Sequence, residues 1–281
     1  MNIVKHLALF FVLSVLIACE SISPDGSKAQ STHFVEDGIT KISVGFETEI
    51  VFCDDVDIDI VEITVSGNLK NYLVLKKDDD ELRINLKAKP GHKIKKSDLV
   101  VRANVERFDE VTGTGASILN FVDVVEKKDF SVKLTGVSIL NGLELNASDE
   151  VEFKLTGASA MNGIKVVSPN IEVQLTGASS IIDAEILTTD LDAELTGASI
   201  ISVSGKLNGE FDVNASGASK IHSYNLISNN VDLELTGKSV IETTVNGIIE
   251  GSATNSSNIK YKGNPTQVNV KTSGGSLVSK N

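Results

Sequence analysis

The pentapeptide LTGAS occupies residues 155–159 and returns at 175–179 and 195–199. Close variants continue the series, as LTGVS at 134–138, ASGAS at 215–219 and LTGKS at 235–239. A catalytic motif normally occurs once, because one pocket needs one nucleophile, whereas a motif copied at a fixed period indicates a repeated backbone geometry. The pentapeptide therefore indicates an architecture rather than an active site.

The glycine of the motif sets the period of the repeat. Its successive positions lie 18 to 21 residues apart, in the series Gly115, Gly136, Gly157, Gly177, Gly197, Gly217, Gly237, Asn255 and Gly275. Asparagine is the usual replacement for glycine where the backbone takes a positive φ. The substitution at position 255 therefore predicts a turn at every glycine of the series.

Apolar residues alternate with polar ones on the way into each turn. In the third repeat they are Val151, Phe153 and Leu155, and the residues between them are charged. Period-two alternation predicts a β-strand of about six residues with one buried face. Apolar residues also recur four positions after the glycine, as Met161, and ten positions before the next glycine, as Val167. Each repeat is thus predicted to contribute two or three short strands separated by corners.

A unit of 20 residues without a helix cannot bury its apolar face alone, but stacked units can. We therefore predict an all-β fold, a right-handed parallel β-helix of about eight 20-residue coils over residues 111–281. Leucine-rich repeats require an asparagine column, and propeller blades require about 40 residues with an aromatic residue in each. Neither pattern fits this repeat.

The predicted stack assigns a role to each residue of the pentapeptide. Leucine fills the core, glycine turns the corner, and threonine points outward. The serines form a column whose hydroxyls are expected to bond the backbone of the neighbouring coil or one another. A catalytic serine is the alternative, but eight equivalent serines cannot all be nucleophiles.

The segment 34–110 lacks the motif yet also alternates, and we expect it to be a strand-rich region continuous with the solenoid. The stretches ITKISVGFETEIVF (39–52) and VDIDIVEITVSG (56–67) are predicted strands, and 71–88 is predicted to be a hairpin that turns at Asp78–Asp80. These strands are expected to cap the first coils, because an open end of the stack is an exposed sheet edge.

The first nineteen residues read MNIVKHLALFFVLSVLIAC, with Lys5 and His6 ahead of an apolar run. Residues 1–18 are therefore a predicted signal peptide, and Leu16–Cys19 resembles the bacterial lipobox, in which the cysteine receives a lipid. We expect a membrane partner through lipid on Cys19, a flexible tether over 19–33, and a place in the bacterial cell envelope at the outer membrane, on its periplasmic or its surface face. A chance cysteine at an ordinary cleavage site is the alternative.

Charge and composition limit the chemistry of the chain. The net charge of −12 argues against nucleic acid as a partner. Cys53 is the one thiol left beside Cys19, so an internal disulfide is not expected, and we predict a buried apolar role rather than a nucleophilic one. The histidines of the mature chain, His33, His92 and His222, are isolated in sequence. We therefore expect neither an enzyme nor a cofactor.

Two acidic patterns remain. The segment Asp55-Val56-Asp57-Ile58-Asp59 has the spacing of a calcium loop, but its apolar residues favour a solvated strand face. Five residues before successive motif glycines stand Glu152, Glu172, Asp192, Asp212, Asp232 and Glu250. We hypothesise that one end of this file is an acidic strip with raised carboxyl pKa values and weak affinity for divalent cations, made of Asp192, Glu194, Asp212, Asp232 and Glu234. Plain solubility is the alternative.

The lipobox, the lead-in GFETEIVF and the corners TGTGASIL and LTGASAMNG resemble the family described as "putative auto-transporter adhesin, head GIN domain". The resemblance covers about residues 34–281. It implies a β-helical protein of the cell envelope with adhesion as its role, and it brings no catalytic residues.

Three functions are open at this point. The first is a non-catalytic envelope lipoprotein that presents flat faces to a protein, a glycan or a surface. The second is a polysaccharide lyase or hydrolase, which would need loops that wall a groove, and steps of 18 to 21 residues leave little room for loops. The third is a structural component of an envelope complex.

Overall fold

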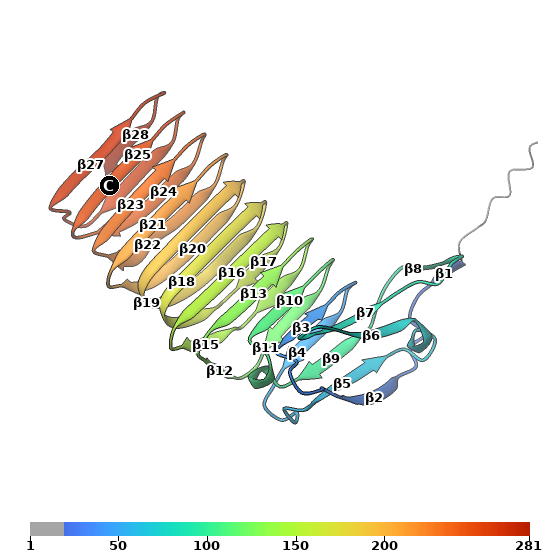
Figure 1. The fold of residues 1–281 in the computed structure, drawn as a ribbon. Helices are drawn as coiled ribbons and strands as arrows, with labels where there is room; N and C mark the ends of the chain where they lie inside the picture. The colour runs from blue at the N-terminus through green and yellow to red at the C-terminus, as the bar shows by residue number, and fades with distance from the viewer. Residues whose placement is uncertain (1–19) are drawn as a thin grey trace, which may run out of the picture.

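The computed structural model describes residues 20–281, so the predicted signal peptide and Cys19 lie outside the described residues. Strands make up most of the described chain, and turns connect them together with two single-turn helices, η1 (Lys70–Tyr72) and η2 (Val105–Arg107). No helix in residues 20–281 has the length and apolar character that a membrane crossing requires. The strands stack into a long rod whose amino-terminal end carries a separate set of strands (Figure 1).

The strands of the amino-terminal part are β1 (Glu20–Ile22), β2 (Ala29–Phe34), β3 (Lys41–Val44), β4 (Glu49–Phe52), β5 (Ile60–Val65), β6 (Leu73–Asp78), β7 (Glu81–Leu86), β8 (His92–Ile94) and β9 (Val100–Ala103). Those of the rod are β10 (Glu110–Gly113), β11 (Ile118–Phe121), β12 (Val124–Lys127), β13 (Phe130–Leu134), β14 (Ile139–Asn141), β15 (Glu144–Ala147), β16 (Glu150–Gly157), β17 (Ala160–Asn162), β18 (Lys165–Gly177) and β19 (Ser180–Gly197). The last coils contain β20 (Ile200–Leu207), β21 (Glu210–Ala215), β22 (Lys220–Ser228), β23 (Asn230–Leu235), β24 (Val240–Val245), β25 (Ile248–Ala253), β26 (Asn258–Lys262), β27 (Gln267–Thr272) and β28 (Leu277–Lys280).

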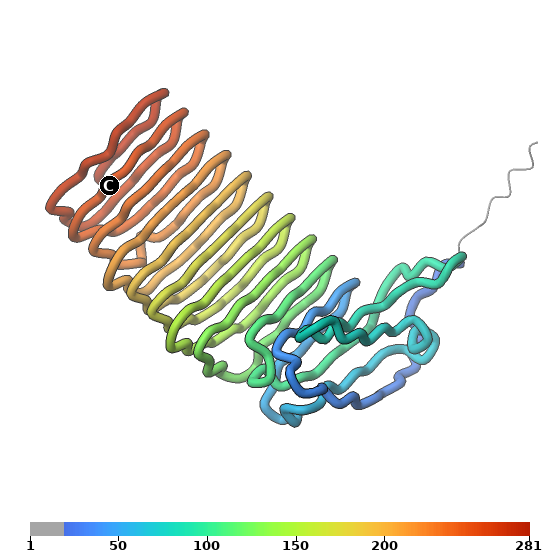
Figure 2. The backbone as a smooth tube through the Cα atoms, viewed as in Figure 1, coloured from blue at the N-terminus to red at the C-terminus, as the bar shows by residue number. Residues whose placement is uncertain are grey.

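The rod is a parallel β-solenoid of about nine turns, and its backbone forms flattened coils stacked in one direction (Figure 2). Strands that lead into the glycine corners pair in parallel from coil to coil, as β13 does with β16 and β21 with β23. We call this layer sheet 1. Strands that follow the corners pair in the same way, as β14 does with β17, and form sheet 2. The predicted β-helix and its strand alternation are confirmed.

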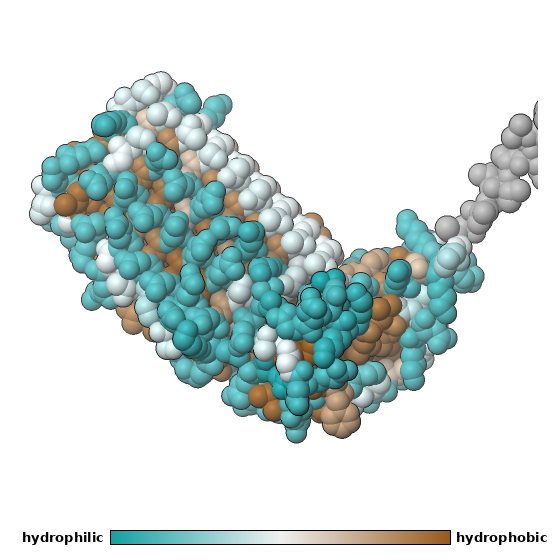
Figure 3. Space-filling model, in the orientation of Figure 1, coloured by the Kyte–Doolittle hydropathy of each residue, from teal (hydrophilic) through white to brown (hydrophobic). Residues whose placement is uncertain are grey.

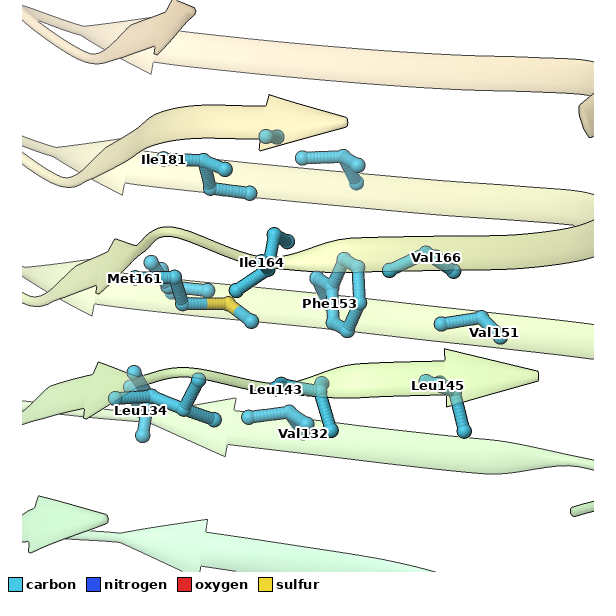
Figure 4. Packing of buried hydrophobic residues seen from close by; sticks show 14 of the residues in the cluster. Val132, Leu134, Leu143, Leu145, Val151, Phe153, Met161, Ile164, Val166 and Ile181 are labelled. Carbon is cyan, nitrogen blue, oxygen red and sulfur yellow. The ribbon is translucent and has the colours of Figure 1, made fainter. Parts of the chain in front are cut away.

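The core lies between the two sheets. Val132 and Leu134 of sheet 1 lie across from Leu143 and Leu145 of sheet 2, and each is at most 1% exposed (Figure 4). The next coil places Phe153 in the same layer. Burial of one such side chain stabilises the fold by about 1.5–3 kcal/mol relative to its exposure to water. The core runs without a break from the amino-terminal strands to Ile259.

The corner glycines have two separate reasons to be glycine. Their φ angles are positive, as at Gly157 (83°) and Gly197 (92°), and Asn255 has a φ of 57° as predicted. In addition, a Cβ on Gly197 would lie 2.5 Å from the carbonyl oxygen of Gly177 in the preceding coil. That oxygen accepts the backbone N–H of Ala198 at 2.7 Å. Each corner is therefore locked against the one before it by backbone alone.

The corner serines are buried, but the predicted bond to the backbone of the neighbouring coil forms only at Ser117 and Ser276, and the other hydroxyls bond within their own turns. Ser138 and Ser159 donate to the carbonyl oxygens of Thr135 and Thr156, both at 2.9 Å, so each hydroxyl closes its own turn. Ser117 donates in addition to the carbonyl of Val44 in a neighbouring coil. The carbonyl three residues earlier is already close in such a turn, so the hydroxyl reaches it without spanning two coils.

The apolar column ten residues before each glycine is only partly buried, which differs from the prediction. Val167 and Leu187 are 44% and 46% exposed, whereas their neighbours Val166 and Ile186 are buried. Before each of these two positions sheet 2 contains one extra residue, with positive φ at Gly163 (59°) and Asp183 (55°), and β20 lacks it, so the register between β19 and β20 shifts by one. One inserted residue moves every following side chain to the other face of a strand.

The segment 39–52 is a coil of the solenoid rather than one strand. It consists of β3, a corner and β4, which pair in parallel with β10 and β11. Phe46 takes the position of the glycine with a φ of 53°, and Thr48 donates to Gly45 as the serines donate in their own turns. This coil contains no LTGAS motif, which explains why the sequence predicted one turn fewer.

A cap covers the first coil, as expected: β7 and β9 pair in parallel with β3 and β4, and antiparallel strands follow outside them. β5 pairs with β9, and β2 pairs with β5. β6 and β7 form the predicted hairpin, with Asp79 in its turn at a φ of 56°. Residues 54–59, however, are turns, and the strand begins only at Ile60.

The predicted flexible tether is wrong for the described residues of 19–33. β1 pairs in parallel with β8, and the N–H of Glu20 donates to the carbonyl of Gly91 at 2.9 Å. β2 adds an antiparallel edge strand to the cap. The small, polar composition of this segment is compatible with edge strands, because the partner strands rather than a hydrophobic face hold them. Of the described residues, those from Glu20 onward therefore belong to the folded body.

Candidate functional site

The file of carboxylates predicted from the repeat exists on the outer face of sheet 1. Glu152 pairs in register with Glu172, and Asp192 pairs with Asp212. Glu172 with Asp192, Asp212 with Asp232 and Asp232 with Glu250 complete the file. The solenoid thus brings together acids that are about 20 residues apart in sequence.

The two ends of this file differ in charge. Toward the amino terminus, Lys133 Nζ lies 2.7 Å from Glu110 Oε2, and Ser131 donates to Glu152. Toward the carboxyl terminus, Glu194 and Glu234 stand in the neighbouring column, separated by Asn214. The negative charge is therefore concentrated over β19, β21 and β23.

The same region is hollowed. Two adjoining clefts of about 420 Å³ and 440 Å³ share Asn214, Glu234 and Ser252 in their walls. We call this surface the acidic trough. Its lining consists of Asp192, Glu194, Thr196, Asp212, Asn214, Ser216, Asp232, Glu234, Thr236, Ser252, Thr254 and Lys271, with parts of Leu195, Val213, Ala215, Leu233, Leu235 and Gly251. Short side chains at Asn214, Gly251 and Ser252 leave the depression between the longer acids.

The electrostatics of the trough follow from this crowding. Partial burial raises the pKa of Asp192 and of Asp212, and neighbouring carboxylates raise both further. The pKa of Glu210 is raised chiefly by the charge of Asp212. Glu210 was not predicted as part of the strip, although it lies two residues before Asp212 on the same strand and the alternation places it on the same face. The predicted direction of the pKa shift is confirmed for Asp192 and Asp212.

No group of three or more His, Cys, Asp or Glu side chains in residues 20–281 is arranged to hold a metal ion. Carboxylates in a file along the rod point outward side by side, whereas a metal site needs them to converge on one point. Cation binding by Asp192, Glu194, Asp212, Asp232 and Glu234 stays a prediction.

A second polar file lies on sheet 2. His222 stands in register between Ser202 and Glu242, and its Nδ1 lies 2.9 Å from Glu242 Oε2. Lys260 Nζ is 3.3 Å from Glu242 Oε1. The hydrogen bond from His222 is the main cause that lowers the pKa of Glu242. The spacing of 20 residues between His222 and Glu242 equals the period of the repeat and would have predicted this pair from the sequence.

This file has the residue types of a hydrolytic triad but not its contacts. A shallow cleft of about 260 Å³ is lined in part by Ser202, His222 and Asp183. Within residues 20–281, no hydrogen bond joins the hydroxyl of Ser202 to the ring of His222. His33 and His92 lie on β2 and β8, in the cap. An activated nucleophile needs its base within hydrogen-bond reach, so the file does not form a catalytic constellation.

A family model described as "Putative auto-transporter adhesin, head GIN domain" matches residues 39–265. The chain belongs to this family. The match includes the coil made by β3 and β4, the whole acidic trough except Lys271, and the His222 file. No curated protein sequence matches the chain.

Solved structures share the fold of this head GIN domain. A "putative adhesin" of Parabacteroides distasonis has a TM-score of 0.61 and 18% identity, over 93% of this chain and 100% of that one. A "putative adhesin" of Parabacteroides merdae has a TM-score of 0.56 and 15% identity, over 93% and 99%. A "putative lipid binding protein" of P. distasonis has a TM-score of 0.58 and 18% identity, over 93% and 100%.

The acids of the loop 54–59 in this head GIN domain form ion pairs. Arg102 Nη2 lies 2.7 Å from Asp55, and Arg107 Nη1 lies 3.0 Å from Asp59. The prediction of a strand face is wrong here, because two arginines from neighbouring segments hold the carboxylates in a turn. Cys53 is a free, buried thiol, and burial raises its pKa to about 11. The predicted buried role of Cys53 is confirmed, since a reactive cysteine needs a lowered pKa.

Sheet 2 of the head GIN domain also contains an asparagine ladder that was not predicted from the sequence. Asn162 donates to Asn141 at 3.1 Å, and Asn141 donates to Asn120 at 3.0 Å. Asn120 donates in turn to Glu49 at 2.8 Å. The ladder ties four successive coils of sheet 2 together. Its signal was the spacing of 21 residues between these asparagines.

The outer surface of the rod is mostly hydrophilic, with apolar patches between the polar columns (Figure 3). A pale ridge of near-neutral hydropathy runs along one edge, as expected for stacked corners of Gly, Ala, Ser and Thr. The stacked corners therefore form a stripe along the rod.

Proposed function

We propose that the mature protein is a bacterial cell-envelope lipoprotein, held at the outer membrane by lipid on Cys19, with a non-catalytic, adhesin-like binding role. The acidic trough is its binding site, and a protein segment rich in lysine or arginine is its partner. Membership of an adhesin family supports the binding role. The observation that carries the choice of site is the coincidence of the hollow in sheet 1 with the crowded carboxylates.

The shape of the trough favours an extended ligand. Its two clefts lie side by side along the strand direction of sheet 1, over the same coils, and are floored by backbone and short polar side chains. Asn214, Ser252 and the corner threonines offer hydrogen-bond donors and acceptors, whereas the rims offer charge. A peptide in extended conformation fits such a surface, because its side chains project alternately toward the sheet and away from it.

The charge of the trough favours a cationic partner. Five carboxylates stand in its walls against one lysine, Lys271. A basic side chain that approaches Asp192 or Asp212 relieves the repulsion that raises their pKa values. Complementary charge mainly increases the association rate and selects the partner. We therefore expect fast, salt-sensitive binding of moderate affinity.

The polysaccharide-active alternative has less support. The Ser202–His222–Glu242 file contains the residue types for hydrolysis, but the pair that would activate the serine makes no hydrogen bond. The coils are also short, so the clefts on both sheets are shallow and lack walls of loop.

The test of the trough uses residues 20–281, which contain every strand of the fold. A lysine-rich peptide and an acidic peptide of equal length are titrated into the protein by calorimetry at low and at physiological salt. The variant Asp192→Asn/Asp212→Asn/Asp232→Asn should lose most of the affinity for the basic peptide. Its matched control is Glu126→Gln/Glu144→Gln/Glu185→Gln, which removes three exposed acids from sheet 2. Equal loss in both variants would refute the trough as the binding site.

The anchor is tested separately. The full chain is expressed in a bacterium with radiolabelled palmitate, next to the variant Cys19→Ser. Label on the wild type and none on the variant is the expected result. A wild type that is unlabelled and leaves the membrane fraction would refute the lipoprotein assignment without bearing on the trough.

A further inference from the structure

We propose that the amino-terminal tip of the rod is a docking surface for anionic phospholipid headgroups. The tip consists of residues 20–28, 65–72 and 87–98, which lie together around β1, β8 and η1. Its basic residues, here called the lysine cluster, are Lys28, Lys70, Lys87, Lys89, Lys93, Lys95 and Lys96.

Contacts between the three segments hold the cluster together. The N–H of Lys95 donates to the carbonyl of Ile22 at 2.9 Å, beside the β1–β8 pairing. Asn68 Nδ2 donates to the carbonyl of Ser23 at 2.8 Å, which places η1 against the same segment. The hydroxyl oxygen of Tyr72 in η1 lies 3.1 Å from His92 Nδ1. Lys89 Nζ lies 5.2 Å from the centre of the Tyr72 ring.

The lysines of the cluster are available to a partner. All seven are exposed, and within residues 20–281 none of them forms a salt bridge. Other lysines of the cap do pair, as Lys77 does with Glu36 and Lys41 with Asp80. The acidic side chains at the tip are Glu20, Asp25, Asp98 and, from the first corner of the rod, Glu47. Asp25, Asp98 and Glu47 accept hydrogen bonds from Ser27, Ser66 and Ser97.

The charge of the tip is opposite to that of the chain. Seven lysines against four carboxylates give the tip a balance of +3, in a protein with a net charge of −12. The excess negative charge of the rod is concentrated at the acidic trough, on coils far from β1 (Figure 1). An anionic surface therefore attracts one end of the rod and repels the other.

Lipid headgroups, rather than another polyanion, are the partner because of where the chain enters. Glu20 is bonded to β8 within the cluster, and one peptide bond joins it to Cys19. Consecutive Cα atoms are about 3.8 Å apart, so a lipid on Cys19 would bring the cluster to the headgroup layer without a tether. This choice of partner rests on the anchor proposed above, whereas the binding itself can be measured without the anchor.

The experiment uses residues 20–281, which lack Cys19, and phosphatidylcholine vesicles with and without phosphatidylglycerol. Co-sedimentation at low and at physiological salt measures binding. A lysine near an anionic surface contributes about 1 kcal/mol, which is about five-fold in affinity. The variant Lys89→Gln/Lys93→Gln/Lys96→Gln should therefore bind anionic vesicles about 100-fold more weakly.

The matched control is Lys206→Gln/Lys220→Gln/Lys238→Gln, which removes three exposed lysines from the rod and gives the same net charge. It should bind within about two-fold of the wild type. The variant Lys89→Arg/Lys93→Arg/Lys96→Arg should retain binding, and equal melting temperatures show that all variants are folded.

Three outcomes overturn the proposal. They are wild-type binding that does not depend on phosphatidylglycerol, wild-type protein that does not sediment with anionic vesicles, and a control that loses as much affinity as the cluster variant. Each is distinguishable from failure of the anchor, because palmitate labelling of Cys19 in the full chain reports on the anchor alone.

Discussion

The stacked corners make a quantitative prediction about Gly197→Ala. Alanine at a φ of 92° costs about 1–2 kcal/mol, because its Cβ crowds the following carbonyl in the left-handed region. Its Cβ would also lie 2.5 Å from the carbonyl oxygen of Gly177. Relief of that overlap costs about 1–3 kcal/mol of strain. Moving this oxygen away also weakens the hydrogen bond that the N–H of Ala198 donates to it, which costs a further 0.5–1.5 kcal/mol, roughly. The expected loss in the free energy of unfolding is about 3–5 kcal/mol.

Gly163→Ala is the matched control. Gly163 also has a positive φ, 59°, but nothing lies within 4 Å of the position where its Cβ would be. This variant carries only the backbone cost of about 1–2 kcal/mol. Urea denaturation followed by circular dichroism gives both free energies from the midpoint and the slope. The two variants should differ by about 2–3 kcal/mol, and a difference below about 0.5 kcal/mol would refute the contact between corners as the reason for glycine.

Three further variants test the trough, the corner and the ladder. Asp212→Asn should raise the melting temperature at neutral pH, because a carboxyl with a raised pKa in the folded state favours folding only when it is protonated. The gain in the free energy of unfolding should be below about 1 kcal/mol, because the Asp212 carboxyl is largely exposed. It should vanish near about pH 3, where Asp212 is protonated in both the folded and the unfolded state. A gain that stays constant from neutral pH to about pH 3 would contradict the raised pKa as its cause. Ser159→Ala should lower the free energy of unfolding by about 1 kcal/mol, because the hydrogen bond to the carbonyl of Thr156 is lost. Urea denaturation measures this change, and an unchanged free energy would show that the bond does not stabilise the turn. Asn141→Ala should speed amide hydrogen exchange in the neighbouring strands of sheet 2, whereas an effect confined to sheet 1 would speak against the ladder.

The repeat could be predicted from the sequence because its causes are local. The φ of Gly157 and the alternation of Val151, Phe153 and Leu155 depend on residues within one strand and its corner. The register of the acids followed from the same period, since parallel coils align equivalent positions. The file from Glu152 to Glu250 was therefore visible before any coordinates.

Features that depend on distant segments could not be predicted in this way. β1 exists because β8, about 70 residues later, supplies its partners, and the composition of 20–33 contains no sign of that pairing. The corner at Phe46 lacks the glycine that marks the others, and its neighbours in β10 impose the turn. The hollow of the trough likewise depends on the combined size of side chains from five coils.

The single extra residue of sheet 2 places Val167 and Leu187 in water, and its absence elsewhere keeps Leu207 inside. The steps between corners vary from 18 to 21 residues, but the rise per coil is fixed, because neighbouring strands are held at about 4.8 Å by their backbone bonds. Gain or loss of one whole coil would shift the carboxyl-terminal coils by that step and leave every column in register. The rod can therefore act as a ruler, in which the number of coils between β1 and β21 sets the height of the trough above whatever surface holds the other end.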